Sequence, residues 1–244
     1  MTFSQLLHAV RQNPQEVVIP SVWGQGRAGF GGLAVALVFE AMRAKVPAGR
    51  PLRSLAVTFV GPLVLDAPVS FEAEVLREGK AVSQVLGRAL QDGQVVTLVQ
   101  GSFGASRASA IDVPALPAPA MKPVAECQEL PYIKNVTPEF TRYLAMRWGE
   151  GGMPFSNNQS RHMGGWVRLR DHDAQEALQE AHLLALVDAW PPAVLPHLKA
   201  PAAGSSLTWT IEFVQPFPAL SSEDWCLYQA EVEHARDGYG HIAA

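Results

Sequence analysis

Apolar residues fill almost every position of one stretch near the start of the chain. Residues 31–45, "GGLAVALVFEAMRAK", predict a helix that is buried on most of its sides. Pro47 and Gly49 follow this stretch and end the helix. A shorter helix is predicted over residues 1–15, which lack the basic start and long apolar run of a signal peptide. The sequence thus predicts a short helix at the start of the chain and a longer, buried helix after a short strand-like run, "EVVIP".

The residues that follow change to the alternating pattern of strands. In "LRSLAVTFVGPL", Leu55, Val57 and Phe59 fall on one face, which predicts a half-buried strand. The next residues, from "APVSFEAEVLREGK" to "VTLVQGSFG", predict a meander with turns at Gly79 and at Asp92-Gly93. Strands joined by such short turns pair antiparallel, because a parallel crossover needs about a dozen residues or more. The sequence therefore predicts an antiparallel sheet after the buried helix.

Gly24, Gly26 and Gly29 form the order G-x-G-x-x-G, which is the outline of a dinucleotide-binding loop. Such a unit also needs a second, parallel strand with an acidic residue roughly 20 residues beyond the glycines. Here the next strand has no carboxylate before Asp66, and it opens an antiparallel sheet. We therefore interpret the glycine pattern as coincidental and expect no nicotinamide cofactor.

A stretch rich in alanine and proline, residues 106–131, lacks periodicity and predicts a semi-stiff linker. After it, "PEFTRYLAMRWGEGG" and "SRHMGGWVRLRD" predict a hairpin. A helix is predicted over residues 173–190 and is ended by Pro191-Pro192. Strands are then predicted in "SSLTWTIEFVQPF" and "DWCLYQAEVEHARDGYGHIAA".

The two halves of the chain repeat each other. "SLAVTFVGPL" matches "LTWTIEFVQPF", with Val57, Phe59 and Pro62 corresponding to Ile211, Phe213 and Pro216. A helix-then-meander unit of ~100 residues that occurs twice indicates duplication of one domain. We predict two units, residues 1–105 and 132–244, joined by the linker 106–131. The first unit has further strands after Gly79 that have no counterpart in the second unit, which stops at Ala244. We therefore expect the open sheet edge of the second unit to pair with further residues or with a neighbouring subunit.

Composition narrows the class of protein. The 244 residues are 48% hydrophobic and 17% charged, and the formal net charge is −4, which gives no electrostatic reason to expect nucleic acid. No apolar stretch is long enough to span a bilayer. Cys127 and Cys226 lie far apart and are expected to be free thiols. We expect a soluble, cytoplasmic protein that needs neither membrane nor nucleic acid.

The stretches "GFGGLAVALVFEA", "SLAVTFVGPL", "EVLREGKAVSQV", "LLALVDAW" and "SSLTWTIEFVQPF" together resemble the TesB-like acyl-CoA thioesterases. The resemblance implies an α+β double hotdog, in which two tandem units each wrap an antiparallel sheet around a long central helix. It also implies hydrolysis of acyl-CoA to a free acid and CoA in fatty acid metabolism, without cofactor or metal. A homodimer or higher homo-oligomer is expected by the same resemblance.

In that family, a helix aspartate, a strand hydroxyl and a glutamine on a later strand hold the attacking water. The resemblance assigns Asp188 to the aspartate and Ser206 to the hydroxyl, and it offers no counterpart for the glutamine. Because Ser206, Thr208 and Thr210 share one face of the strand, Thr208 is an alternative hydroxyl if the register slips by two.

The chemistry of the residue types leaves several alternatives open. Apolar neighbours of Asp188 would raise its pKa toward that of a usable base, but an aspartate here could also cap a turn. Ser206 could orient water or face solvent. The N–H groups of Gly31 and Gly32 could face the substrate, or the glycines could serve close packing. Trp190, beside Asp188, is expected to contact the substrate.

Glu40, in the buried helix, is a second candidate carboxylate, since some single-hotdog thioesterases use a helix glutamate; a residue that reaches solvent at the helix edge is the favoured interpretation. The leading hypothesis for function is an acyl-CoA thioesterase. The alternative is a hotdog protein that binds acyl-CoA or another acyl ligand without turnover.

Overall fold

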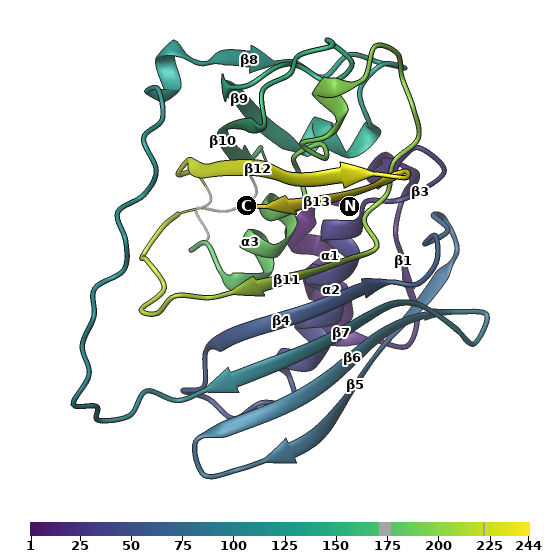
Figure 1. Cartoon of the computed structure of the whole chain (residues 1–244). Helices are drawn as coiled ribbons and strands as arrows, with labels where there is room; N and C mark the ends of the chain where they lie inside the picture. The colour runs from purple at the N-terminus through teal and green to yellow at the C-terminus, as the bar shows by residue number, and fades with distance from the viewer. Residues whose placement is uncertain (171–176, 222) are drawn as a thin grey trace.

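Two large antiparallel sheets, one two-stranded sheet and three α-helices make up the fold of the computed structural model, which describes residues 1–170, 177–221 and 223–244 (Figure 1). The first half contains α1 (Phe3–Gln12), β1 (Val17–Val18), β2 (Gly24–Gln25), β3 (Ala28–Gly29), α2 (Gly31–Arg43), β4 (Leu52–Phe59), β5 (Pro68–Glu78), β6 (Val82–Gln91) and β7 (Gln94–Gly104). The second half contains β8 (Gln128–Leu130), β9 (Leu144–Glu150), β10 (His162–Leu169), α3 (Glu180–Val187), β11 (Thr208–Glu212), β12 (Cys226–Arg236) and β13 (Tyr239–Ala243).

One strand of the second half joins the sheet of the first half. The six-stranded sheet has the order β1-β5-β6-β7-β4-β11, and the five-stranded sheet has the order β13-β12-β10-β9-β8. Strand β11 pairs antiparallel with β4, with Trp209 opposite Val57. Figure 1 shows β11 lying between β4 and β13, at the place where the two sheets approach each other. The two halves of the chain therefore share one sheet.

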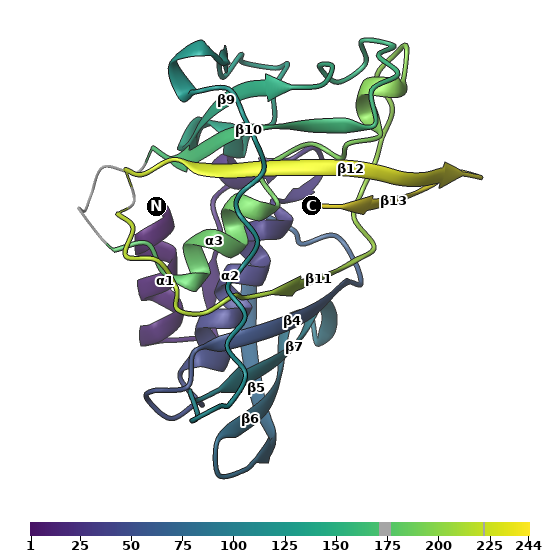
Figure 2. The ribbon, with the colours of Figure 1, turned by 60° about the vertical axis from the view of Figure 1, so that its left-hand side comes forward.

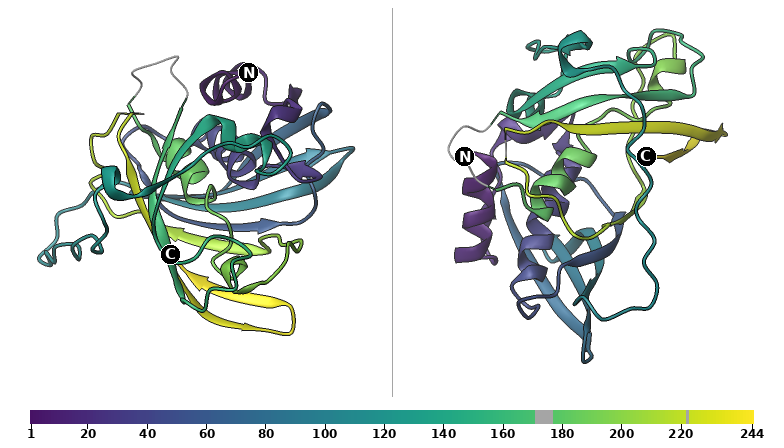
Figure 3. Two further views of the ribbon diagram at one scale, coloured as in Figure 1. Left: turned by 90° about the horizontal axis from the view of Figure 1, so that it is seen from above. Right: turned by 90° about the vertical axis from the view of Figure 1, so that its left-hand side faces the viewer.

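Helix α2 is the centre of the core. Every residue from Gly32 to Met42 is buried, and the helix packs against β5, β6 and β7. Glycine at position 87 makes this close packing possible, because a Cβ there would lie only 2.5 Å from Cγ1 of Val38 and 2.6 Å from Sδ of Met42. Helices α1 and α3 flank α2, as the rotated views show (Figures 2 and 3). The expected buried helix is confirmed.

The turns of the first meander also follow the expectation. Strands β5, β6 and β7 pair in sequence order, and the β6–β7 turn places Asp92 and Gly93 at positive φ, 51° and 74°. Gly24 and Gly29 pair in the short β2–β3 ladder, with Gly26 at φ 63° in its turn. The glycine pattern thus forms a tight hairpin, which explains its spacing without a nucleotide.

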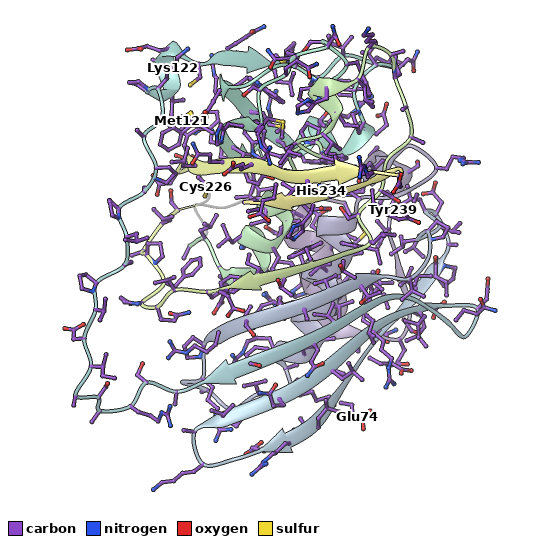
Figure 4. All side chains as sticks on the ribbon, viewed as in Figure 1. Glu74, Met121, Lys122, Cys226, His234 and Tyr239 are labelled. Carbon is purple, nitrogen blue, oxygen red and sulfur yellow. The ribbon has the colours of Figure 1, made fainter. Side chains whose placement is uncertain are left out.

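Two segments differ from the sequence-based prediction. The helix expected over residues 173–190 is shorter: α3 ends at Val187, directly before Asp188, and residues 173–176 lie outside the described residues. The Pro/Ala-rich segment has no helix or strand up to residue 123, but its end forms β8, which pairs with β9. Met121, in this segment, lies over the sheet, where a Cβ on Gly149 would come within 2.5 Å of its Sδ (Figure 4).

The interpretation of Glu40 as a residue that reaches solvent is wrong. Its side chain is buried, and its carboxylate accepts a hydrogen bond from Nε of Arg11 on α1 at 2.5 Å. A buried carboxylate needs such a cation, because removing it from water is costly. The pair therefore fastens α1 to α2. In the part of the chain that the structure describes, no helix has the length and apolarity to cross a membrane.

We expect Arg11→Met to lower the free energy of unfolding by about 1–3 kcal/mol, because it leaves Glu40 buried without its cation. The half-exposed Arg11 side chain keeps this below the effect of breaking a fully buried pair. Urea unfolding measures the change, and the double variant Arg11→Met/Glu40→Met should recover most of it. The control is Arg88→Met, whose exposed partner Glu74 should leave stability within about 0.5 kcal/mol. Equal losses for the two arginines would contradict the assignment.

Candidate functional site

The start of α2 lies directly against Asp188. A Cβ on Gly31 would lie 2.9 Å from Oδ2 of Asp188, and a Cβ on Gly32 would lie 2.8 Å from Cβ of Asp188. Phe30, the residue before the helix, offers no side-chain cap. Instead the Gly32 N–H donates a hydrogen bond to the Asp188 carboxylate. The glycines therefore serve close packing, as one of the two interpretations has it, while an approach of their N–H groups to the substrate stays a prediction.

Asp188 occupies the first position after α3 and is half-buried. Burial raises the pKa of its carboxyl group to about 7, and the hydrogen bond from Gly32 opposes this rise only in part. The C-terminal end of α3 also disfavours a negative charge, whereas the N-terminal end of α2 favours it. Near neutral pH both protonation states are populated, which suits a general base.

Trp190 and Tyr228 form a stacked pair beside Asp188. Their rings are parallel within 7° with centroids 5.2 Å apart, and Trp148 tilts against Trp190 at 5.1 Å. Burial and the charge of Asp188 together raise the pKa of Tyr228 to about 12, so its phenol lies within electrostatic reach of the carboxylate. The indole N–H of Trp190 is buried and finds no acceptor among the described residues.

A second aromatic pair approaches the helix start from the shared sheet. The ring of Phe59, on β4, would lie 2.9 Å from a Cβ on Gly31, and Trp209, on β11, lies 6.1 Å from that ring. Both side chains are half-buried. The carboxylate and the helix start are thus surrounded by rings from both halves of the chain.

The two predicted strand hydroxyls flank Leu207, whose carbonyl oxygen accepts a hydrogen bond from the N–H of Phe59. Ser206 is exposed in the segment before β11, and Thr208 is exposed on the strand face opposite Trp209. In the part of the chain that the structure describes, neither hydroxyl hydrogen bonds to the Asp188 carboxylate. The structure therefore brings Asp188, Gly31, Gly32 and Trp190 into one region, whereas Ser206 and Thr208 are exposed and make no hydrogen bond to Asp188 within the described residues.

Three aromatic residues of this region were not foreseen as site residues: Phe59, Trp209 and Tyr228. Phe59 was recognised only as part of an alternating strand. Tyr228 carries no local signal, because its proximity to Asp188 depends on how β12 packs against the end of α3. No three His, Cys, Asp or Glu side chains of the described ranges lie close enough together to hold a metal ion.

Both halves of the chain match models of one protein family. Residues 19–104 match the acyl-CoA thioesterase N-terminal domain, and residues 119–244 match the acyl-CoA thioesterase C-terminal domain. The chain belongs to the acyl-CoA thioesterase family. The sequence resemblance to acyl-CoA thioesterases is therefore confirmed at the level of this family. A comparison with curated protein sequences found no match.

Solved structures show that this thioesterase family member has the double hotdog fold. A hot dog-fold protein of unknown function from Alicyclobacillus acidocaldarius has 24% identity and a TM-score of 0.78, covering 92% of this chain and 82% of that chain. The acyl-CoA thioesterase II TesB2 from Mycobacterium marinum has 17% identity and a TM-score of 0.67, covering 93% and 83%. The TesB protein MAP1729c from Mycobacterium avium subs paratuberculosis has 18% identity and a TM-score of 0.66, covering 96% and 88%. The expected fold is confirmed.

The raised pKa of Asp188 predicts a stability that depends on pH. The folded protein keeps this proton up to about pH 7, whereas the unfolded chain releases it near its ordinary value of 3.8. The contribution of Asp188 is therefore complete below about pH 4 and is lost as the pH rises to about 7. Relative to wild type, Asp188→Asn should gain stability across this interval. Because Asp188 is half-buried, we expect a gain of about 1–3 kcal/mol.

Urea unfolding of both proteins between pH 4 and about 8 measures this difference. Asp112→Asn, at an exposed position of the linker segment, is the matched control and should show no such trend. A difference between wild type and Asp188→Asn that stays constant with pH would contradict the raised pKa.

Proposed function

We propose that the protein hydrolyses acyl-CoA thioesters, with Asp188 as the general base. The observation that carries this proposal is the half-buried carboxylate whose pKa is raised to about 7 at the start of the central helix. Membership of the acyl-CoA thioesterase family supports the substrate class. A base with such a pKa is half ionised at neutral pH and can both accept and return a proton.

In the proposed reaction, the ionised Asp188 carboxylate accepts a proton from water as the water oxygen attacks the thioester carbonyl carbon. A tetrahedral oxyanion forms and then collapses, which breaks the carbon–sulfur bond. The CoA thiolate leaves and takes the proton from the Asp188 carboxyl group. The products are a free acid and CoA, and the carboxylate is regenerated. No cofactor or metal enters this sequence of steps.

We assign the reactive end of the substrate to the region between the start of α2 and the Trp190 ring. Gly31 and Gly32 keep the helix start free of side chains, and the half-buried rings of Tyr228 and Phe59 offer apolar surface beside the buried Trp190. The acyl chain would extend along apolar side chains near α2. Ser206 and Thr208 stay candidates for a water-orienting hydroxyl.

The exposure of Ser206 and Thr208 favours a second candidate function. A hotdog protein that binds acyl-CoA without hydrolysing it would need the apolar surface and the helix start, but not a second water-holding group. We also expect a homodimer or higher homo-oligomer. The edges of β11 and β13 have no further strand paired to them in the described ranges, and such edges can pair with another chain.

Release of free thiol from a series of acyl-CoA substrates tests the proposal. We expect turnover by the wild type and a loss of at least about 100-fold in kcat for Asp188→Asn, because the amide cannot accept the proton. Asp112→Asn, which removes an exposed carboxylate of the same size, should retain full activity. Thermal protection by an acyl-CoA without any turnover would establish the binding function instead.

The pH dependence of kcat/KM tests the assignment of the base. Because only the ionised carboxylate accepts a proton, the rate should rise with pH through an apparent pKa of about 7 and level off above it. An ordinary, exposed carboxylate would place this rise near the normal value of 3.8. A rate that is flat from pH 5 to about 8 would therefore exclude Asp188 as the base.

A further inference from the structure

The proposed reaction requires a hydrogen-bond donor for the oxyanion. Negative charge develops on the thioester oxygen when water adds to the carbonyl carbon, and donors aimed at this oxygen lower the barrier. The start of α2 is a natural source of such donors. However, the N–H of Gly32 already donates to the Asp188 carboxylate. A further donor close to Asp188 would therefore complete the site.

Tyr228 has the position and the chemistry of this donor. It lies on the same strand face as the buried residues Ala230 and Val232, so β12 directs it toward the interior. It is only half-buried, which leaves its phenol accessible to a ligand. Within the described residues its hydroxyl makes no hydrogen bond, while the charge of Asp188 acts on it.

The neighbouring Trp190 supports a ligand at this place. Its side chain is 5% exposed, and its indole N–H has no acceptor among the residues that the structure describes. A buried donor without an acceptor is unfavourable and uncommon in folded proteins. The stacked rings of Trp190 and Tyr228 thus carry two donors without an acceptor in the described part of the chain, of which the Tyr228 hydroxyl is the one that a ligand oxygen can reach.

We infer that the Tyr228 hydroxyl donates a hydrogen bond to the thioester carbonyl oxygen of the substrate and stabilises the charge that develops there. This inference depends on the proposed thioesterase function and adds a catalytic residue to it. Tyr228 keeps its proton throughout: the oxyanion forms when the water oxygen bonds to carbon, and its electron pair returns when the carbon–sulfur bond breaks. The stack on Trp190 holds the phenol ring in place during both steps.

Tyr228→Phe tests the inference because it removes the hydroxyl and keeps the stacked ring. We expect kcat to fall roughly 30- to 100-fold while KM changes less than about twofold, since the donor acts mainly in the transition state. The acid limb of the pH profile should stay in place, because Asp188 is retained. A kcat within about twofold of wild type, or a shifted acid limb, would overturn the inference.

The matched control is Tyr239→Phe. Tyr239 is 70% exposed at the start of β13, and it lies at the far end of the β12–β13 hairpin from Cys226 (Figure 4). The same hydroxyl is removed there without any contact to the Asp188 region, so kcat and KM should equal those of the wild type. A loss of activity as large as that of Tyr228→Phe would overturn the inference, since it would show an unspecific effect.

Binding of two unreactive CoA analogues separates this inference from the proposed function. One is a ketone that keeps the carbonyl and replaces sulfur with a methylene; the other is a thioether that replaces the carbonyl with a methylene. Tyr228→Phe should weaken binding of the ketone roughly 5- to 10-fold and leave that of the thioether unchanged. This result can be obtained even if the wild type hydrolyses no thioester, in which case only the proposed function fails. An equal loss for both analogues, or no binding of either to the wild type, would overturn the inference.

Discussion

The hydrogen bond from the Gly32 N–H to the Asp188 carboxylate is the contact on which the rest of the site depends. It joins the start of α2, where backbone N–H groups lack acceptors within the helix, to the end of α3, where a negative charge is disfavoured. Helix α2 begins with backbone donors that no side chain of its own N-cap satisfies. Asp188 follows the last turn of α3, where its charge is disfavoured unless a donor faces it. The glycines permit the approach, because any side chain at either position would collide with Asp188.

The shared sheet explains why residues from distant parts of the sequence surround this contact. Strand β11 extends the sheet of the first half by pairing with β4, which brings Trp209 to Phe59. Strand β12 belongs to the other sheet and brings Tyr228 to Trp190. The carboxylate therefore lies where both sheets meet the helix ends. Aromatic rings on both sides limit its contact with water, and this limited contact is the main cause of its raised pKa.

Much of the fold could be predicted from the sequence, because the pattern that indicates each element lies within a few neighbouring residues. The apolar run of α2, the alternation of β4 and the Asp92-Gly93 turn each depend on neighbouring residues only. Asp188 could be named from the resemblance, and Gly31 and Gly32 from the backbone donors at a helix start. The pairing of Glu40 with Arg11 could not, because the partner lies 29 positions away on another helix. The proximity of Tyr228 to Asp188 could not be predicted for the same reason, because it depends on the packing of β12 and not on a spacing along the chain.

The roles of Ser206 and Thr208 stay predictions, because a transferred residue role depends on more than the position of a residue in a strand. The position of a residue in a strand fixes the face on which its side chain lies. The distance from that side chain to a helix end also depends on which further strands pair beside it. Here β11 has β4 on one side and no further strand on the other among the described residues, so its hydroxyls face solvent. The interior face carries Trp209 and Ile211 instead. The interior face of β12 carries Tyr228, stacked on Trp190, which is why we propose Tyr228 as the further polar group that acts with Asp188.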